Sequence, residues 1–130
     1  MIDLLAFEPI KKFIDTVGKD IEKYFGKDNA SFLCLRPDGI FYGEALVQWL
    51  KQRKKTNVLV ATMEDDGADL TEDSVRGRKV LIVNNDVITG KSYKRSTDAL
   101  RVKKKEWGIK DVKFATFFDR VGVADFAVAK

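Results

Sequence analysis

Histidine is absent from this chain of 130 residues, and its absence excludes several kinds of chemistry at once. Neither Ser-His nor Cys-His catalysis is available, and no metal site can use an imidazole ligand. Cysteine is almost absent too, because Cys34 is the only one, which rules out an intrachain disulfide. Its apolar neighbours favour a buried, inert thiol over a nucleophile.

Long apolar runs are also missing from the sequence. No segment approaches the ~20 apolar residues that span a bilayer, and the N-terminus lacks a basic-then-apolar signal pattern. We therefore expect a cytoplasmic protein without a membrane partner.

Neither sign of charge dominates, since 24 basic residues face 20 acidic ones for a net charge of +4. A mildly basic protein suits a small anionic ligand, but the mixing of the two signs argues against a dedicated nucleic-acid surface. With 45% hydrophobic residues, the chain is long enough to bury a core. We expect a single domain over residues 1–130, with an N-terminal helix over 1–26 and the core over 30–130.

Three segments show helical spacing of apolar residues, at about residues 2–25, 42–54 and 91–107. Pro9 marks an early start of the first helix. Lys103–Lys105 lie near the end of the third, where they complement the helix dipole without any ligand.

Short apolar runs between these helices predict strands at about residues 31–35, 58–62, 80–83 and 112–118, with a shorter one at 124–129. Polar alternation is weak within them, which indicates a sheet covered on both faces. We therefore predict an α/β fold with a doubly wound, mostly parallel sheet of about five strands and helices on both faces. Ligands of such sheets bind beyond the carboxyl ends of the strands.

The stretch from Met63 to Arg76 is rich in acidic residues and has no periodicity. We favour a solvated loop here over a cation site. Its acidic residues are Glu64, Asp65, Asp66, Asp69, Glu72 and Asp73.

Residues 78–92 carry the most informative pattern, RKVLIVNNDVITGKS. Four aliphatic residues, 80–83, predict a buried strand; a polar run and a small-residue turn follow, and then a helix begins. A strand, a turn and a helix N-terminus make a phosphate site, because the amides of the first helical turn lack intrahelical partners.

This pattern resembles the phosphoribosyl-pyrophosphate loop of the type I phosphoribosyltransferases, most nearly the purine-salvage branch. There an acidic pair, two aliphatic residues and Asp-Thr-Gly-Lys-Thr follow the strand. The resemblance implies that Asn84 and Asn85, in place of the acidic pair, hold the ribose. It implies that a 5-phosphate is held by Thr89, Gly90, Lys91 and Ser92.

The sequence departs from the family pattern where the chemistry is usually placed. Asn84 and Asn85 lack charge, so contacts to the ribose and to magnesium weaken. Ile88 stands where an aspartate accepts a proton from the base, which an aliphatic side chain cannot do. A one-residue shift would instead align residues 85–88 with the Asp-Asp-Val-Ile of the pyrimidine and adenine branches; we prefer the ungapped alignment. Asp86 is the candidate catalytic residue.

The turn Arg36-Pro37-Asp38-Gly39 resembles the family's pyrophosphate-binding loop, with Arg36 as a bidentate donor. We expect the Arg36–Pro37 bond to be the cis peptide that this loop often contains. The alternative is a plain Pro-Asp-Gly β-turn with a solvated arginine.

The C-terminal stretch resembles the segment that contacts the purine in the salvage enzymes. Arg120 falls where a lysine reads the exocyclic oxygen of the base. Phe126 either stacks on the base or is a core phenylalanine.

The resemblance implies a protein that binds phosphoribosyl pyrophosphate or a nucleoside monophosphate and transfers the 5-phosphoribosyl group between pyrophosphate and a nitrogenous base, with a purine expected. It also implies Mg²⁺, carried with phosphoribosyl pyrophosphate if the protein is active, and no side chain is assigned to the metal. The alternative is a catalytically silent nucleotide-sensing or partner-binding module that keeps the fold. The sequence leaves open whether the protein forms a homodimer.

Overall fold

The computed structural model describes residues 7–36 and 39–129. Its elements, in chain order, are α1 (Glu8–Phe25), β1 (Ala30–Leu35), α2 (Gly39–Gln52), β2 (Val58–Met63), the short 3₁₀ helix η2 (Glu72–Ser74), β3 (Lys79–Val87), α3 (Lys91–Trp107), β4 (Asp111–Asp119) and β5 (Phe126–Ala129).

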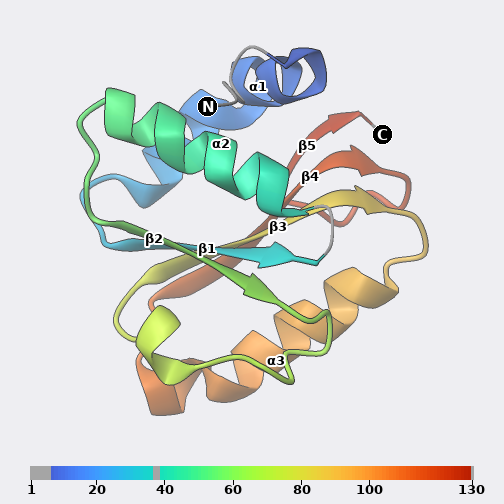
Figure 1. The fold of residues 1–130 in the computed structure, drawn as a ribbon. Helices are drawn as coiled ribbons and strands as arrows, with labels where there is room; N and C mark the ends of the chain where they lie inside the picture. Colours follow the sequence, from blue (N-terminus) through green and yellow to red (C-terminus); the bar gives the residue numbers. More distant parts are fainter. Residues whose placement is uncertain (1–6, 37–38, 130) are drawn as a thin grey trace.

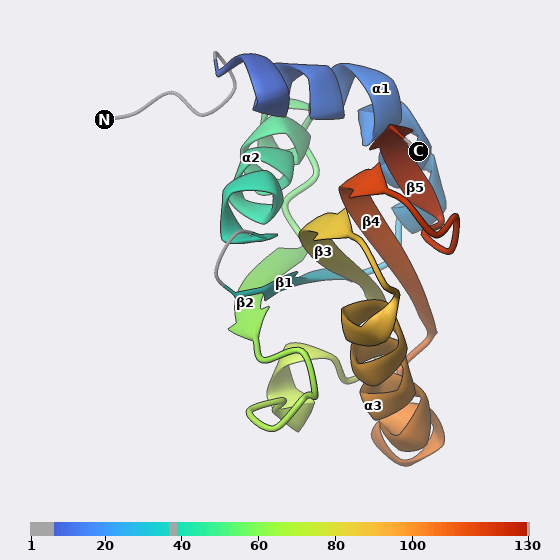
Figure 2. The same ribbon diagram turned by 90° about the vertical axis from the view of Figure 1, so that its right-hand side faces the viewer.

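The five strands form one sheet in the order β2-β1-β3-β4-β5, and every neighbouring pair is parallel. Helices α1 and α2 lie on one face of the sheet and α3 on the other, as Figures 1 and 2 show. The structure therefore confirms the predicted α/β fold with a parallel sheet and helices on both faces.

Two apolar cores lie between the sheet and its helices, one on each face of the sheet. The first joins the buried faces of α1 and α2 to the sheet, and the second lies beneath α3. The sequence of α1 explains its packing. Its apolar residues recur every three or four positions, so one side of the helix is apolar and packs on the sheet. Those buried residues are Ile10, Phe13, Ile14, Val17, Ile21 and Phe25.

Strand β3 is longer than the sequence predicts, because Asn84, Asn85 and Asp86 extend it instead of forming a turn. Asn84 pairs with Thr116 and Asp86 with Phe118 on β4. A sheet ladder is made by backbone groups, so polar side chains do not end a strand whose neighbour continues beside it.

Helix α2 begins at Gly39, earlier than the predicted start near Tyr42, and ends at Gln52 instead of Lys54. Lys54 has a left-handed backbone with φ 68°, which no helix can continue. Close packing requires a glycine at this position, because a Cβ on Gly39 would collide with the carbonyl oxygen of Val83 on β3.

Strands β4 and β5 are parallel although only residues 120–125 connect them, where a helical crossover is usual. The buried carboxylate of Asp119 stabilises the tight turn between these two strands. It accepts hydrogen bonds from the amides of Val121, Gly122 and Ala124 at 3.2, 2.8 and 2.8 Å. The chain thereby folds back beside β4 at once.

None of the helices within residues 7–36 and 39–129 combines the length and apolar character needed to cross a membrane.

Candidate functional site

The direction of the chain connections reverses between β1 and β3. From β1 the chain passes through α2 to β2 on one side, and later returns to β3 on the other side of β1. Because the connections leave these two strands in opposite directions, their ends form the topological switch point where open α/β sheets bind ligands.

A cavity of about 130 Å³ lies at the end of β3. It is formed by one continuous segment that includes most of the predicted phosphate and ribose positions. Its lining residues are Asn84, Asp86, Val87, Ile88, Thr89, Gly90, Lys91, Ser92 and Tyr93.

Gly90 shapes this cavity as the N-cap residue of α3. Its φ of 85° and ψ of 0° are left-handed, a conformation that glycine adopts without steric cost. No side chain caps the helix closely; the nearest is the Thr89 hydroxyl, 3.4 Å from the amide nitrogen of Lys91. The first-turn amides of α3 thus remain available to an anion, which a helix N-terminus favours.

The polar residues of β3 divide between the two faces of the strand. Asn84 and Asp86 line the cavity, whereas Asn85 between them does not. The side chain of Asn84 is engaged locally: its Oδ1 accepts the Asn85 amide at 2.9 Å, and its Nδ2 donates to the Asp86 carbonyl at 3.0 Å. The structure thus brings Asn84 and Asp86 to the cavity but not Asn85.

Two exposed aliphatic side chains border the same cavity. Ile88 lines it and is 44% exposed. Val121, 46% exposed, approaches Gly90 so closely that a Cβ there would lie 3.9 Å from its side chain. Exposed apolar groups beside a polar cavity offer a surface to a flat ring. The sequence analysis assigned Val121 no role in the site.

The other predicted turn lies at the end of β1. Arg36 is present there with its side chain partly exposed, and Gly39 packs on β3 as the first residue of α2. Pro37, Asp38 and the proposed cis bond lie outside the described residues. Arg36 and the phosphate turn therefore follow two adjacent strands, β1 and β3.

Acidic residues of the loop after β2 contact both the turn that begins at Arg36 and the phosphate turn. Arg36 Nη2 lies 2.6 Å from Glu64 Oε1 and 2.6 Å from Asp69 Oδ2. Ser92 Oγ donates to Asp65 Oδ2 at 3.3 Å. The sequence reading of a solvated loop overlooked these contacts, because the chain separates the acids from their partners by some 27 to 33 residues.

The two predicted base-binding residues lie in different places. Arg120 is exposed just after β4, and its amide donates to the Val87 carbonyl at 2.8 Å, which ties the ends of β3 and β4 together. Phe126 packs against Tyr24 of α1 with ring centroids 6.1 Å apart, and it does not line the cavity. Its position matches the alternative reading of a core phenylalanine.

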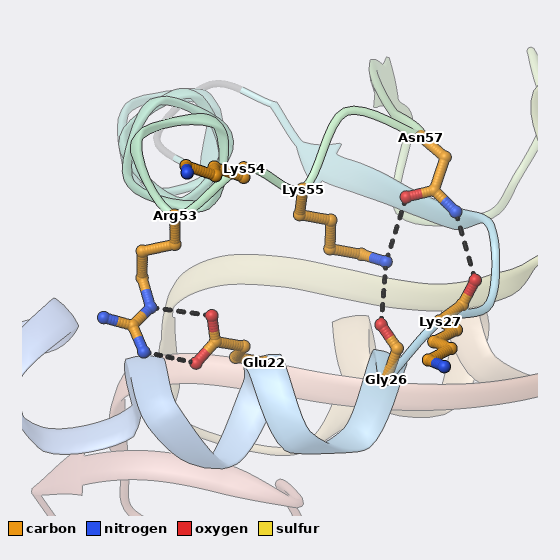
Figure 3. Close-up of a pocket in the computed structure, with 7 residues that line it drawn as sticks. All are labelled: Glu22, Gly26, Lys27, Arg53, Lys54, Lys55 and Asn57. Carbon is orange, nitrogen blue, oxygen red and sulfur yellow. Dashed lines mark hydrogen bonds and ion pairs between the residues drawn. The ribbon is translucent and has the colours of Figure 1, made fainter.

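A larger pocket, about 370 Å³, lies at the opposite edge of the sheet, before β1 and β2 (Figure 3). Its polar groups are largely satisfied within the protein. Arg53 forms two hydrogen bonds to Glu22, at 2.6 and 2.8 Å, and Lys55 Nζ donates to the Gly26 and Asp28 carbonyls and to Asn57 Oδ1. These bonds tie α1 to α2, and we assign this pocket a structural role.

Comparison with known proteins gives matches of structure and not of sequence. No family model matches the sequence, and no curated protein matches it significantly.

Solved structures are similar over almost the whole chain. A hypoxanthine phosphoribosyltransferase from Staphylococcus aureus has a TM-score of 0.72 and 17% identity, covering 95% of this chain and 73% of that one. A hypoxanthine-guanine-xanthine phosphoribosyltransferase has a TM-score of 0.75 and 18% identity over 94% and 73%. The hypoxanthine-guanine enzyme from Leishmania tarentolae, in complex with GMP, has a TM-score of 0.74 and 17% identity over 93% and 75%.

At such low identity the likeness establishes the fold, and the chain folds as a type I phosphoribosyltransferase.

Proposed function

We propose that this protein binds phosphoribosyl pyrophosphate or a nucleoside monophosphate between β1 and β3, and that it transfers the 5-phosphoribosyl group between pyrophosphate and a nitrogenous base. The observation that carries the proposal is the cavity at the N-terminus of α3, where the left-handed Gly90 leaves first-turn amides open at the topological switch point. The likeness to phosphoribosyltransferases of the purine-salvage branch supports it.

In this proposal the 5-phosphate lies against the α3 N-terminus. Backbone amides of Thr89–Ser92 and the Thr89 and Ser92 hydroxyls donate to its oxygens, and Lys91, whose side chain is exposed, adds positive charge. Arg36 and the adjoining turn hold the pyrophosphate, since a guanidinium matches two phosphate oxygens. Asn84 and Asp86 face the ribose.

The reaction exchanges one bond at the anomeric carbon for another. The bond from that carbon to a pyrophosphate oxygen breaks and the electron pair leaves with pyrophosphate, while a ring nitrogen of the base forms the new bond and loses its proton. Ile88 cannot take this proton. Asp86 is the only carboxylate among the described residues that line the cavity, and we assign it as the acceptor.

A purine is the base that we propose, on the likeness to the hypoxanthine enzymes. Ile88 and Val121 offer apolar contact to its ring, and Arg120 offers a donor to an exocyclic oxygen. Phe126 has no part in this proposal, because it packs against Tyr24.

Within the described residues no group of three or more His, Cys, Asp or Glu side chains could hold a metal ion. The Asn84 amide oxygen beside Asp86 already accepts the Asn85 amide. Any magnesium would therefore arrive with the diphosphate, and no step above depends on it.

The test compares two glycines of α3. Gly90→Ala and Gly108→Ala each place a Cβ on a left-handed residue, at φ 85° and 65°. Each should cost about 1 kcal/mol or more of stability. Only Gly90→Ala should also weaken binding of phosphoribosyl pyrophosphate by about tenfold or more, measured by calorimetry with magnesium.

Product assays with a panel of purine and pyrimidine bases complete the test. A purine nucleotide should accumulate with the unaltered protein and not with Gly90→Ala. Equal binding by both glycine variants would contradict the phosphate site. Donor binding without product for any base would instead support the silent nucleotide sensor.

A further inference from the structure

The loop that follows β2, residues 64–69, connects the two turns to which the proposed function assigns anions. Its carboxylates form ion pairs with Arg36 at one end and with Arg95 of α3 at the other. Figures 1 and 2 show the chain after β2 running beside α3.

At the β1 end, two carboxylates share one guanidinium nitrogen. Glu64 Oε1 and Asp69 Oδ2 each lie 2.6 Å from Arg36 Nη2. The second oxygen of Asp69 accepts the Glu64 amide at 2.9 Å, which holds the two acids in one arrangement. Arg36 is thus occupied by groups that resemble the phosphate oxygens it is proposed to bind.

At the α3 end, Asp65 contacts two side chains of the helix. Its Oδ2 accepts from Ser92 Oγ at 3.3 Å and from Arg95 Nη1 at 3.4 Å. Gly67 seats the loop on the same helix, because a Cβ on it would lie 2.6 Å from the Ala99 Cβ. The loop is largely exposed, as predicted, and is held in place by contacts at both ends.

We propose that residues 64–69 form an acidic latch that competes with the diphosphate for Arg36 and must release that arginine before an anion binds there. This proposal rests on the proposed function and describes the regulation of the same site. A bound diphosphate beside Glu64 and Asp69 would meet two like charges, so the latch lowers the affinity of the closed protein for free anions.

The latch is weak enough to open. The side chains of Arg36, Glu64 and Asp69 are 41%, 56% and 37% exposed, so water and salt screen their attraction. The Glu64 amide, and then Arg36, hold the pKa of Asp69 below its ordinary value. Its contribution is present at neutral pH and lost only as the pH falls through that lowered value, so competing anions and not protons would open the latch.

The experiment titrates inorganic pyrophosphate, without metal, into the intact protein and two charge-matched variants. Glu64→Gln/Asp69→Asn removes the two acids on Arg36. Glu72→Gln/Asp73→Asn removes two acids of the same connection, where Glu72 pairs with Arg76 and Asp73 is exposed. The first variant should bind pyrophosphate about tenfold more tightly, and the second should change the affinity less than twofold.

Amide hydrogen exchange in the unaltered protein gives a second readout that does not depend on any variant folding. Gly67 and Ala68 donate within the loop, to the Glu64 carbonyl and to Asp66 Oδ1. Pyrophosphate should speed exchange of these two amides as the latch opens. Bound pyrophosphate with unchanged exchange would overturn the proposal.

Three results of the titration would also overturn it: unchanged or weaker binding by Glu64→Gln/Asp69→Asn, equal tightening by the control variant, or no pyrophosphate binding by any of the proteins. Failure of the proposed function looks different. If the latch variant binds pyrophosphate more tightly and yet no base yields product, the latch stands and transferase activity does not.

Discussion

At the scale of single residues, Asn84 stands where the family pattern has a carboxylate, and its amide side chain makes two hydrogen bonds to its own strand. Its Nδ2 donates to the Asp86 carbonyl and its Oδ1 accepts the Asn85 amide. A carboxylate could keep the second bond only, because it has no proton to donate. The asparagine therefore suits the end of β3 irrespective of any ligand.

This argument predicts the effect of restoring an acid at position 84. Asn84→Asp should lower the free energy of unfolding at pH 7 by about 1 kcal/mol, because the new carboxylate would face the Asp86 carbonyl. That repulsion raises the pKa of the new carboxyl in the folded protein, so the loss should shrink as the pH falls and the group is protonated. Urea denaturation at pH 7 and pH 4 measures both effects.

Asn85→Asp is the matched control, because it makes the same charge change one residue away, where the side chain makes no contact that the structure records. Its cost should be within about 0.5 kcal/mol of zero. Equal losses for the two variants would show that net charge, and not the bond to Asp86, governs the effect.

At the scale of elements, two glycines one helical turn apart let α2 pack directly on the sheet. A Cβ on Gly39 would collide with the Val83 carbonyl, and one on Gly43 with Cys34 Sγ. The close fit also explains the inert cysteine that the sequence predicts, since burial raises the pKa of the Cys34 thiol to about 12.

The contact between Gly43 and Cys34 predicts a coupling between two substitutions. Gly43→Ala should cost about 1–3 kcal/mol of stability through overpacking. Cys34→Ala removes the sulfur that the new methyl group would meet, so the double variant should lose at least about 1 kcal/mol less than the sum of the single losses. Chemical denaturation of the three variants measures the coupling.

Gly39→Ala provides the contrast, because its neighbour is backbone and no side-chain substitution can relieve the clash. Additive losses for Gly43→Ala and Cys34→Ala would contradict the close contact.

At the scale of the whole molecule, Tyr24 links the first helix to the start of β4. It lies at the end of α1, and its hydroxyl donates to Asp111 Oδ2 of β4 at 3.1 Å. Burial, and then the Asp111 carboxylate, raise the pKa of Tyr24 well above its ordinary value. The folded protein therefore keeps a neutral phenol where the unfolded chain would ionise.

The sign of this shift predicts loss of stability at alkaline pH. The contribution of Tyr24 is fully present below about pH 10, where the phenol ionises in the unfolded chain, and it is lost as the pH rises further. Because the side chain is only half-buried, we expect a loss of about 1 kcal/mol by pH 11. Tyr24→Phe should lose that much less stability than the unaltered protein between pH 9 and pH 11 in guanidinium denaturation. Parallel losses would contradict this.

Much of the fold could be predicted from the sequence, because its evidence is local. The apolar spacing of α1 and α3, and the aliphatic runs of the strands, depend on residues close together in the chain. The turn at Gly90 was predictable for the same reason. The extension of β3 through Asn84–Asp86 was not, because it depends on β4 continuing beside it.

The sequence by itself determined the alternation of strands and helices and the glycine turn before α3, since these follow from backbone geometry and local patterns of side chains. Only the tertiary structure decided that β1 lies between β2 and β3, that Phe126 faces Tyr24, and that Glu64 and Asp69 hold Arg36. The physical reason is distance along the chain: these contacts join residues far apart in sequence, and they form only when the packed sheet brings them together.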